Sequence, residues 1–479
     1  MRSINPAIVV DRHKTFQVVI LVLFLIGLTA CSAHYPVNKS ASSGEAVAKY
    51  NIRKEGGSPR SSELLLILTF SGGGTRAAAF SYGVLEALAD TEVVINGRLG
   101  RLLDEVDGIS SVSGGSFTAA YYGLFGDRIF EDFETKFLKN NVQRELKKRL
   151  FSPWNWPKLS SLHYDRSDLF ADYYDELLFE KKTFQDIRNR KGPVVAINAT
   201  DMAMGSQFSF SGFQFAPICS DLMSFPVSRA VTASSAVPGP FTSIILKNHA
   251  GTCDYTMPEW ATEALRKRRS TTRRYHIANR VDAYRNADKY RYIHLQDGGL
   301  SDNLGVRLMI DITLAEGNIW KKLEDLDLKN TSTLAIIVVN AKKKQDISFA
   351  KRDYSIPLWD TIGVSSSIPL DQYSYETMEL LRGNIDDWRA SISVGRCQEL
   401  KEKDVALRDP ETGKSRCAAF TYLIEVNFDA LEDDAEREHL KSLATSFVLD
   451  PEDVDRLRAA AREILKHSEE FKKFVEDLQ

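Results

Sequence analysis

The chain has 479 residues, of which 43% are hydrophobic and 27% are charged, and its formal net charge is −3. This length suits one large or two medium globular domains with a buried core. A charge so close to balance excludes the strongly basic surface that nucleic-acid binding requires, so no nucleic-acid partner is expected.

The first thirty residues have the features of an export signal. Basic residues precede the apolar run 18–28, VVILVLFLIGL, which is shorter than the roughly 20 residues of a membrane-spanning helix. A short transmembrane anchor is the alternative. The stretch 28–31, LTAC, resembles the lipobox of bacterial lipoproteins, in which the cysteine becomes the first mature residue and carries lipid. The resemblance implies a signal peptide over 1–30 and acylation of Cys31.

The segment after Cys31 is predicted to be a tether. Residues 32–62 are rich in Ser, Gly, Lys and Pro and have no apolar periodicity, which predicts a lipid-anchored flexible tether over 31–62. Ser32 stands where an aspartate would, by analogy with enterobacterial lipoproteins, mark retention at the inner membrane. The expected location is therefore the outer membrane.

Four cysteines remain in the expected mature chain: Cys219, Cys253, Cys397 and Cys417. Export to an oxidising compartment permits disulfides. Neighbours along the chain suggest the pairs 219–253 and 397–417, although four cysteines allow three connectivities and isolated buried thiols explain the sequence equally well. No closely spaced Cys or His pair indicates a metal site, and none is expected.

Folded sequence begins at residue 64 with LLLILTF, a continuous apolar run that is typical of a strand buried on both faces. A glycine turn and a helical apolar pattern follow it, and the stretch 107–123 repeats this order. Further strands are predicted at 192–200, 290–296, 334–341 and 420–428, and helices at 167–179 and over the amphipathic tail 450–478. Alternating strands and helices predict an α/β fold with a mostly parallel central sheet, helices on both faces and a helical C-terminal extension.

The glycine turn 72–77, GGGTRA, supports two different functions. Its unpaired amides at a helix N-terminus attract negative charge, which suits either a dinucleotide phosphate or an oxyanion hole. A dinucleotide site also requires an acidic residue at the end of the second strand, roughly twenty residues further on. Asp90 and Glu92 are near that spacing, but they precede the predicted strand 93–95.

A possible nucleophile lies at Ser113. The stretch 111–115, SVSGG, approximates the G-x-S-x-G elbow, in which a tight turn from strand to helix lifts the serine hydroxyl above the sheet. A serine requires a base, and Asp297 follows a predicted strand in the segment DGG. His294 lies three residues earlier and is expected to be structural. All three motifs are expected at the carboxyl ends of strands, where functional groups of open α/β sheets gather.

The order GGGxR, SxSGG and DGG resembles the patatin-like phospholipases over about residues 64–306. The family uses a Ser–Asp dyad, so the resemblance implies that Ser113 is the nucleophile and Asp297 the base. It also implies that Gly72, Gly73 and Gly74, with Arg76 beside them, form the oxyanion hole. Ala77 and Ser111 stand where the family usually has glycine.

The resemblance also implies a three-layer hydrolase domain over 63–310, followed by an α/β continuation with a terminal helix over 311–479. The implied activity is that of a membrane-tethered serine acyl hydrolase of the phospholipase A type, which cleaves carboxylic esters of phospholipids or related lipids. No cofactor is implied. Two alternatives stay open: a dinucleotide-binding oxidoreductase built on residues 72–77, and a lipoprotein that serves as a non-catalytic membrane-binding scaffold.

Overall fold

The computed structural model describes residues 34–42, 60–95, 97–269, 272–344, 348–351, 353 and 358–478, together with residue 17. The predicted signal peptide, apart from residue 17, and the predicted acylation site at Cys31 lie outside the described residues. Within the described part of the chain, no helix combines the length and the apolar character that crossing a membrane requires.

The core of the protein is an eight-stranded sheet in the order β10-β9-β1-β4-β5-β8-β7, with β6 paired to β5. The strands from β10 to β5 run parallel, whereas β6 and β8 run antiparallel to β5, and β7 runs antiparallel to β8. The strands are β1 Leu64–Phe70, β4 Val106–Val112, β5 Val194–Asp201, β6 Ser206–Phe210, β7 Ile244–Lys247, β8 Tyr292–Asp297, β9 Thr333–Asn340 and β10 Phe420–Asn427. The predicted mostly parallel sheet is confirmed.

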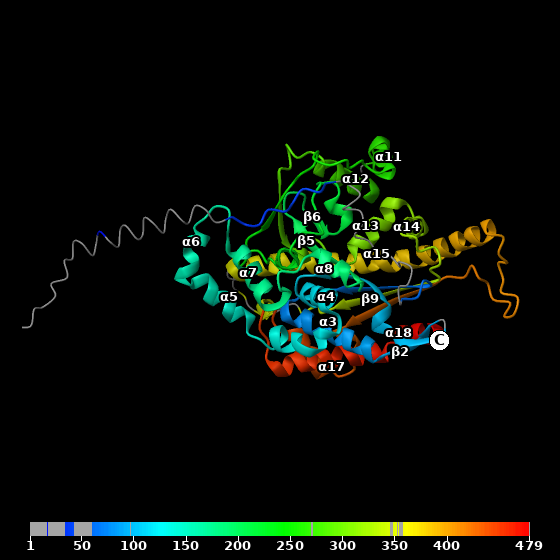
Figure 1. The fold of residues 1–479 in the computed structure, drawn as a ribbon. Coiled ribbons are helices and arrows are strands. Elements are labelled where there is room, and N and C mark those ends of the chain that lie inside the picture. Colours follow the sequence, from blue (N-terminus) through cyan, green and yellow to red (C-terminus); the bar gives the residue numbers. More distant parts are fainter. Residues whose placement is uncertain are drawn as a thin grey trace, which may run out of the picture.

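Helices cover both faces of this sheet (Figure 1). The α-helices that the structure describes are α3 Gly74–Asp90, α4 Gly114–Phe125, α5 Val142–Phe151, α6 Trp156–Leu159, α7 Arg166–Tyr174, α8 Phe184–Asn189, α9 Gly212–Phe215, α10 Val227–Ser234, α11 Glu259–Lys267, α12 Arg273–Tyr284, α13 Arg307–Glu316, α14 Ile319–Asp325, α15 Leu358–Glu402, α16 Asp434–Ser442, α17 Pro451–His467 and α18 Glu469–Leu478. The predicted helix 167–179 is α7 continued by a π-helical segment, Asp175–Phe179, and the predicted tail helix is interrupted between α17 and α18.

The strands form three layers with these helices because successive side chains of a strand point to opposite faces. On β1, Leu66 and Leu68 belong to a hydrophobic core that includes buried residues of α3, α4 and α17. Leu65 belongs to a second core, together with Trp320 of α14 and Trp388 of α15. This arrangement explains the continuous apolar sequence of β1, which is buried on both sides.

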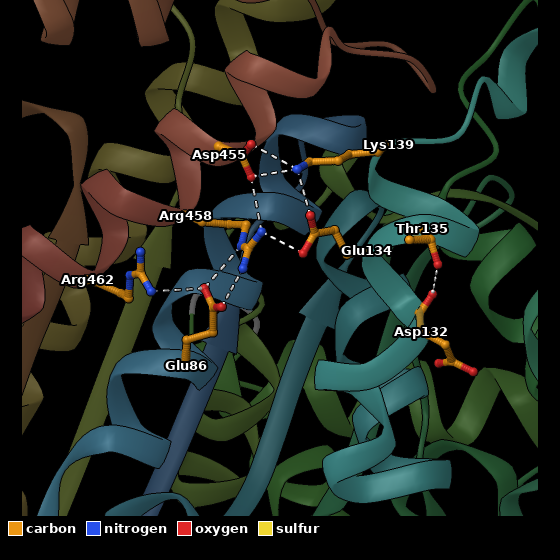
Figure 2. A network of polar contacts seen from close by, with 8 residues as sticks. All are labelled: Glu86, Asp132, Glu134, Thr135, Lys139, Asp455, Arg458 and Arg462. Atoms are coloured by element: carbon orange, nitrogen blue, oxygen red, sulfur yellow. Dashed lines mark hydrogen bonds and ion pairs between the residues drawn. The ribbon is translucent and has the colours of Figure 1, made fainter.

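The C-terminal region is part of the same body, since β9 pairs with β1 and β10 pairs with β9 in one sheet. Helix α17 packs closely on α3, where a Cβ at Gly83 would lie 2.5 Å from the carbonyl oxygen of Arg458. Figure 2 shows Arg458 of α17 between Glu86 and Glu134, at 2.6 and 2.7 Å from their carboxylates. Lys139 extends this network to Asp455 of α17 at 2.8 Å.

Residues 34–42 differ from the predicted flexible tether, because they lie against the folded body. Asn38 is buried, and its side-chain amide donates to Ser220 Oγ at 2.7 Å and to the carbonyl oxygen of Lys247 at 2.8 Å. The backbone amide of Ala41 donates to the carbonyl oxygen of Cys219 at 2.8 Å. The tether prediction therefore requires correction here, because this segment satisfies its polar groups on the body of the protein.

The structure pairs Cys219 with Cys253 and Cys397 with Cys417. These are the pairs that nearness along the chain suggested, and the alternative of isolated thiols is wrong.

Candidate active site

Ser113 occupies a sharp turn between β4 and α4. Its φ of 48° is unusual for a residue with a side chain, and such conformations persist where the surrounding structure holds them. Its backbone amide donates to Ser234 Oγ at 2.8 Å, and Ser234 Oγ donates to the carbonyl oxygen of Asn198 at 2.6 Å. These two hydrogen bonds hold the turn against the neighbouring strand β5.

Asp297, the last residue of β8, accepts a hydrogen bond from the hydroxyl of Ser113, with 3.0 Å between Oγ and Oδ2. Its other carboxylate oxygen accepts the amide of Gly299 at 2.8 Å. Burial raises the pKa of Asp297 to about 6, and the hydrogen bonds from Gly299 and Ser113 oppose this rise. The two side chains that the sequence singled out, 184 positions apart, are therefore in direct contact.

The sheet register explains this contact. Val112, the last residue of β4, pairs with Asn198 of β5, and Asp297 pairs with the next residue, Ala199. Because β4 is parallel and β8 antiparallel to β5, their carboxyl ends approach each other along one edge of β5. The opposite edge of that segment is taken by β6. The carboxyl ends of the two strands therefore lie close together, as expected. Asp297, however, follows a strand that is antiparallel to its neighbour β5, whereas Ser113 follows a parallel one.

Gly114, which follows Ser113, and Gly298, which follows Asp297, each lie against the backbone of another segment. A Cβ at Gly114 would lie 2.0 Å from the carbonyl oxygen of Gly74, so the two glycine turns are in contact. A Cβ at Gly298 would lie 2.2 Å from the carbonyl oxygen of Asn198. No other residue fits at either position without displacing backbone.

The glycine turn before α3 lies beside this site, since a Cβ at Gly72 would lie 3.3 Å from Cβ of Ser113. The amides of Gly73, Gly74 and Gly114 have no hydrogen-bond acceptor among the described residues. Gly72 differs from them, because its amide donates to the carbonyl oxygen of Asn303 at 3.0 Å. The amide of Gly72, one of the predicted oxyanion donors, is therefore already engaged. The amide of Gly114, the residue after Ser113, was not among the predicted donors and has no acceptor within the described residues.

Arg76 ties the glycine turn to the C-terminal region. Its buried guanidinium donates from Nε to the carbonyl oxygen of Ala341 at 3.0 Å and from Nη1 to that of Leu443. Nη2 donates to Thr445 Oγ1 at 3.3 Å, and burial lowers the pKa of Arg76 to about 10. All three nitrogens of the Arg76 guanidinium therefore have partners outside the site, and its predicted place beside the oxyanion donors stays a prediction.

Several polar residues that support the site were not identified from the sequence. Ser234 and Asn198 hold the elbow, and Asn303 engages Gly72. Each lies in a segment with many polar residues close to one of the motifs, but only the tertiary contacts distinguish them from their neighbours. His294 is exposed, and its Nδ1 lies 3.3 Å from Ser243 Oγ.

A cavity of about 520 Å³ lies beside the loop that follows Asp297. Ser301 lines it, and its Oγ lies 2.8 Å from Oγ1 of Thr200. Thr200 Oγ1 donates in turn to the backbone oxygen of Asp297 at 2.8 Å. Two hydrogen bonds therefore connect the cavity wall to the backbone of the candidate base.

The same cavity is lined by three arginines, Arg273, Arg280 and Arg307, and by one carboxylate, Asp311. Arg280 pairs with Asp311 at 2.7 Å, whereas Arg273 Nε lies 3.9 Å from it. Nη1 of Arg273 is buried and has no hydrogen-bond partner within the described ranges. The cavity lining thus has more positive than negative charge.

The dinucleotide alternative loses its acidic residue in this fold. The predicted strand 93–95 is β2, Glu92–Ile95, which pairs with β3, Arg98–Arg101, in a separate two-stranded sheet. In the main sheet β1 lies between β9 and β4; β4 is the next of these along the chain, and Ser113 follows it. A dinucleotide-binding site built on residues 72–77 would need an acidic residue at the end of β4, where this chain has Ser113.

These features define an α/β protein with a serine at a strand-to-helix elbow and a buried carboxylate hydrogen-bonded to it. Residues 68–310 match the family model described as patatin-like phospholipase. The chain belongs to this family, and membership supports lipid acyl hydrolysis as its class of activity.

Comparison with solved structures finds human GIVD cytosolic phospholipase A2, at 12% identity and a TM-score of 0.43, over 91% of this chain and 63% of that one. Its complex with methyl gamma-linolenyl fluorophosphonate gives 12% identity and a TM-score of 0.39, and the complex that also holds terbium chloride gives 13% and 0.40. Both cover 91% of this chain and 62% of that one. The chain spans less than two thirds of that enzyme. None of the curated proteins compared with the chain matches it.

Proposed function

We propose that the protein is a serine acyl hydrolase that cleaves the carboxylic esters of phospholipids through a Ser113–Asp297 dyad. The observation that carries this proposal is the 3.0 Å hydrogen bond from the Ser113 hydroxyl to the buried carboxylate of Asp297. A serine hydroxyl is a weak nucleophile until an adjacent base accepts its proton. The family supports the reaction class, and the contact supports the assignment of roles.

The reaction would proceed in two halves. Asp297 Oδ2 takes the proton as Ser113 Oγ attacks the ester carbonyl, and the negative oxygen that forms is stabilised by the free amides of Gly73, Gly74 and Gly114. The alcohol leaves with the proton from Asp297, and an acyl-enzyme stays on Ser113. Water then attacks the acyl-enzyme and loses a proton to Asp297. The bond from the acyl carbon to Ser113 Oγ breaks, Asp297 returns the proton to this oxygen, and the fatty acid is released.

The arginine-lined cavity supports a phospholipid over a neutral lipid ester as the substrate. Arg273, Arg280 and Arg307 supply fixed positive charge, which suits a phosphate group. The cavity lies next to the loop that bears Asp297, so a head group bound there would stay near the reacting ester. We propose in addition that acylated Cys31 holds the enzyme on the outer membrane, as the lipobox resemblance implies.

The proposal is tested by treating the full chain with a fluorophosphonate probe and mapping the modified peptide by mass spectrometry. We expect the probe on Ser113, and we expect the unmodified enzyme to release fatty acids from mixed phospholipid vesicles. The same peptide map tests the anchor, because it distinguishes an acylated N-terminal Cys31 from an unmodified one. Labelling at another serine, or no release of fatty acid, would refute the assignment.

The pH dependence of activity tests the role of Asp297 separately. A general base works only when it is ionised, and burial raises the pKa of this carboxyl to about 6. We expect kcat/KM on a soluble ester to fall about tenfold per pH unit below this pKa and to be level above it. A profile that stays flat down to the ordinary range of an aspartate would contradict Asp297 as the base.

A further inference from the structure

A group of large apolar side chains is exposed at the tip of the structure between α5 and α7. Phe151, Trp154, Trp156 and Leu162 are 72%, 90%, 58% and 96% exposed. We call residues 151–162 the aromatic tip. Four large apolar side chains exposed within twelve residues indicate an interaction surface, because such a cluster is costly to leave in water. Helix α6, which belongs to the tip, lies at the outer edge of the molecule, far from β2 and α18 (Figure 1).

The chemistry of the aromatic tip matches the surface of a bilayer. Tryptophan is enriched at membrane interfaces, where its ring sits among apolar chains and its N–H stays hydrated. Leu162, by contrast, has no polar group and suits the acyl region. Both kinds of side chain occur here within twelve residues, together with Pro153 and Pro157, which limit the conformations of the loop.

Positive charge surrounds the aromatic tip. Residues 142–163 include five basic residues and a single acidic one, Glu145. The exposed basic residues are Arg144, Lys147, Lys148 and Lys158. Basic residues next to a membrane surface are attracted to anionic lipids, and each adds to binding within a Debye length. The charge therefore complements an anionic bilayer.

The N-terminal segment of the chain reaches the same place. The ring of His34 stacks on that of His163 at 4.8 Å, and the amide of Tyr35 donates to the carbonyl oxygen of His163 at 2.6 Å. The predicted acylation site, Cys31, precedes His34 by three residues, which span at most about 11 Å. A lipid on Cys31 would thus enter the membrane beside Leu162.

We propose that the aromatic tip is a membrane-docking surface for anionic phospholipid bilayers and acts together with the acyl chains on Cys31. Trp154 and Trp156 lie at the head groups, Phe151 and Leu162 enter the acyl region, and the basic side chains bind lipid phosphates. A lipid anchor alone leaves the body free to rotate, whereas a second contact fixes its orientation on the membrane. Docking does not require catalysis by Ser113, so it stands apart from the proposed hydrolysis.

The docking surface is tested with fluorescent probes on the full chain. Leu162→Cys is labelled with an environment-sensitive fluorophore, and Leu99→Cys on β3, where the native side chain is 63% exposed, is the matched control. The four native cysteines that the structure describes are in disulfides and do not react. With phosphatidylcholine–phosphatidylglycerol vesicles, we expect emission at 162 to shift to shorter wavelength and increase several-fold, and emission at 99 to stay unchanged.

Equal changes at both positions, or no change at 162, would overturn the docking surface. A response as large on pure phosphatidylcholine would overturn its preference for anionic lipid. A double variant, Trp154→Ser with Trp156→Ser, separates docking from hydrolysis: we expect hydrolysis of vesicles to fall several-fold and hydrolysis of a soluble ester to be unchanged. A probe response at 162 with no ester hydrolysis would support docking and refute the proposed function, whereas the reverse result would refute docking alone.

Discussion

Replacement of Ser113 by alanine is expected to lower ester hydrolysis by at least about 10³-fold, because alanine has no hydroxyl to form the acyl-enzyme. The residual activity would come from the oxyanion donors and from substrate binding. Alanine removes one hydrogen bond to Asp297 and keeps the backbone turn, so the midpoint of thermal unfolding should change little. Steady-state hydrolysis of a soluble ester and circular dichroism measure the two effects.

Ser81→Ala provides a matched control. Ser81 is also a buried serine, on α3, and its hydroxyl has no hydrogen-bond partner in the described part of the chain. Activity within a few-fold of the unmodified enzyme is expected for this variant. If Ser113→Ala kept comparable activity and fluorophosphonate labelling, Ser113 would not be the nucleophile.

Replacement of Asp297 by asparagine is expected to lower activity on the order of 10⁴-fold, because asparagine cannot take the serine proton. The amide has the same shape as the carboxyl group and can still accept the hydrogen bond from Gly299. Asp201→Asn is the control: Asp201 is another buried aspartate, which accepts the hydroxyl of Tyr284 at 2.8 Å and lies outside the site. We expect this control to keep activity within a few-fold.

The Asp297→Asn variant is expected to be more stable than the unmodified enzyme at neutral pH. The pKa of Asp297 is about 6 in the folded protein and near 3.8 in the unfolded chain, so the folded state binds this proton more tightly. This contribution to the free energy of unfolding is present below about pH 4 and is lost as the pH rises through 6. The loss is on the order of 3 kcal/mol.

The Asp297→Asn variant has no carboxyl group to ionise and does not lose this stability. Its thermal stability relative to the unmodified enzyme should therefore increase between pH 4 and 6 and stay constant above that range. Thermal unfolding of both proteins from pH 4 to 8 measures it. A variant that is less stable than the unmodified enzyme at pH 8 would contradict the burial of a costly carboxylate at this position.

Much of the fold could be predicted from local sequence. The apolar run at Leu64–Phe70 required a strand buried on both faces, and it lies between two hydrophobic cores. Glycine at positions 114 and 298 indicated sharp corners, and both corners leave no space for a side chain. The spacing of apolar residues over 450–478 predicted helix, although not the interruption at Ser468.

Arg76 shows where local sequence stops being informative. Its position beside the glycine turn suggested a role in the oxyanion hole, but its partners Ala341, Leu443 and Thr445 are more than 260 residues away along the chain. The direction of a long side chain depends on which acceptors the tertiary structure places within its reach. Residues 34–42 give the same lesson, since their polar composition is that of a linker and their partners lie on distant strands and loops.

The sequence by itself determined the strands and the corners, because these depend on hydrophobic periodicity and on the small residues that tight turns require. The order of the three motifs, through its family resemblance, singled out Ser113 and Asp297 as candidates. Only the tertiary structure decided how the two side chains meet. Two strands of opposite direction end on adjacent residues of β5, Asn198 and Ala199, and this register brings Asp297 to Ser113. Pairing between distant strands depends on the packing of the whole sheet, which no local pattern contains.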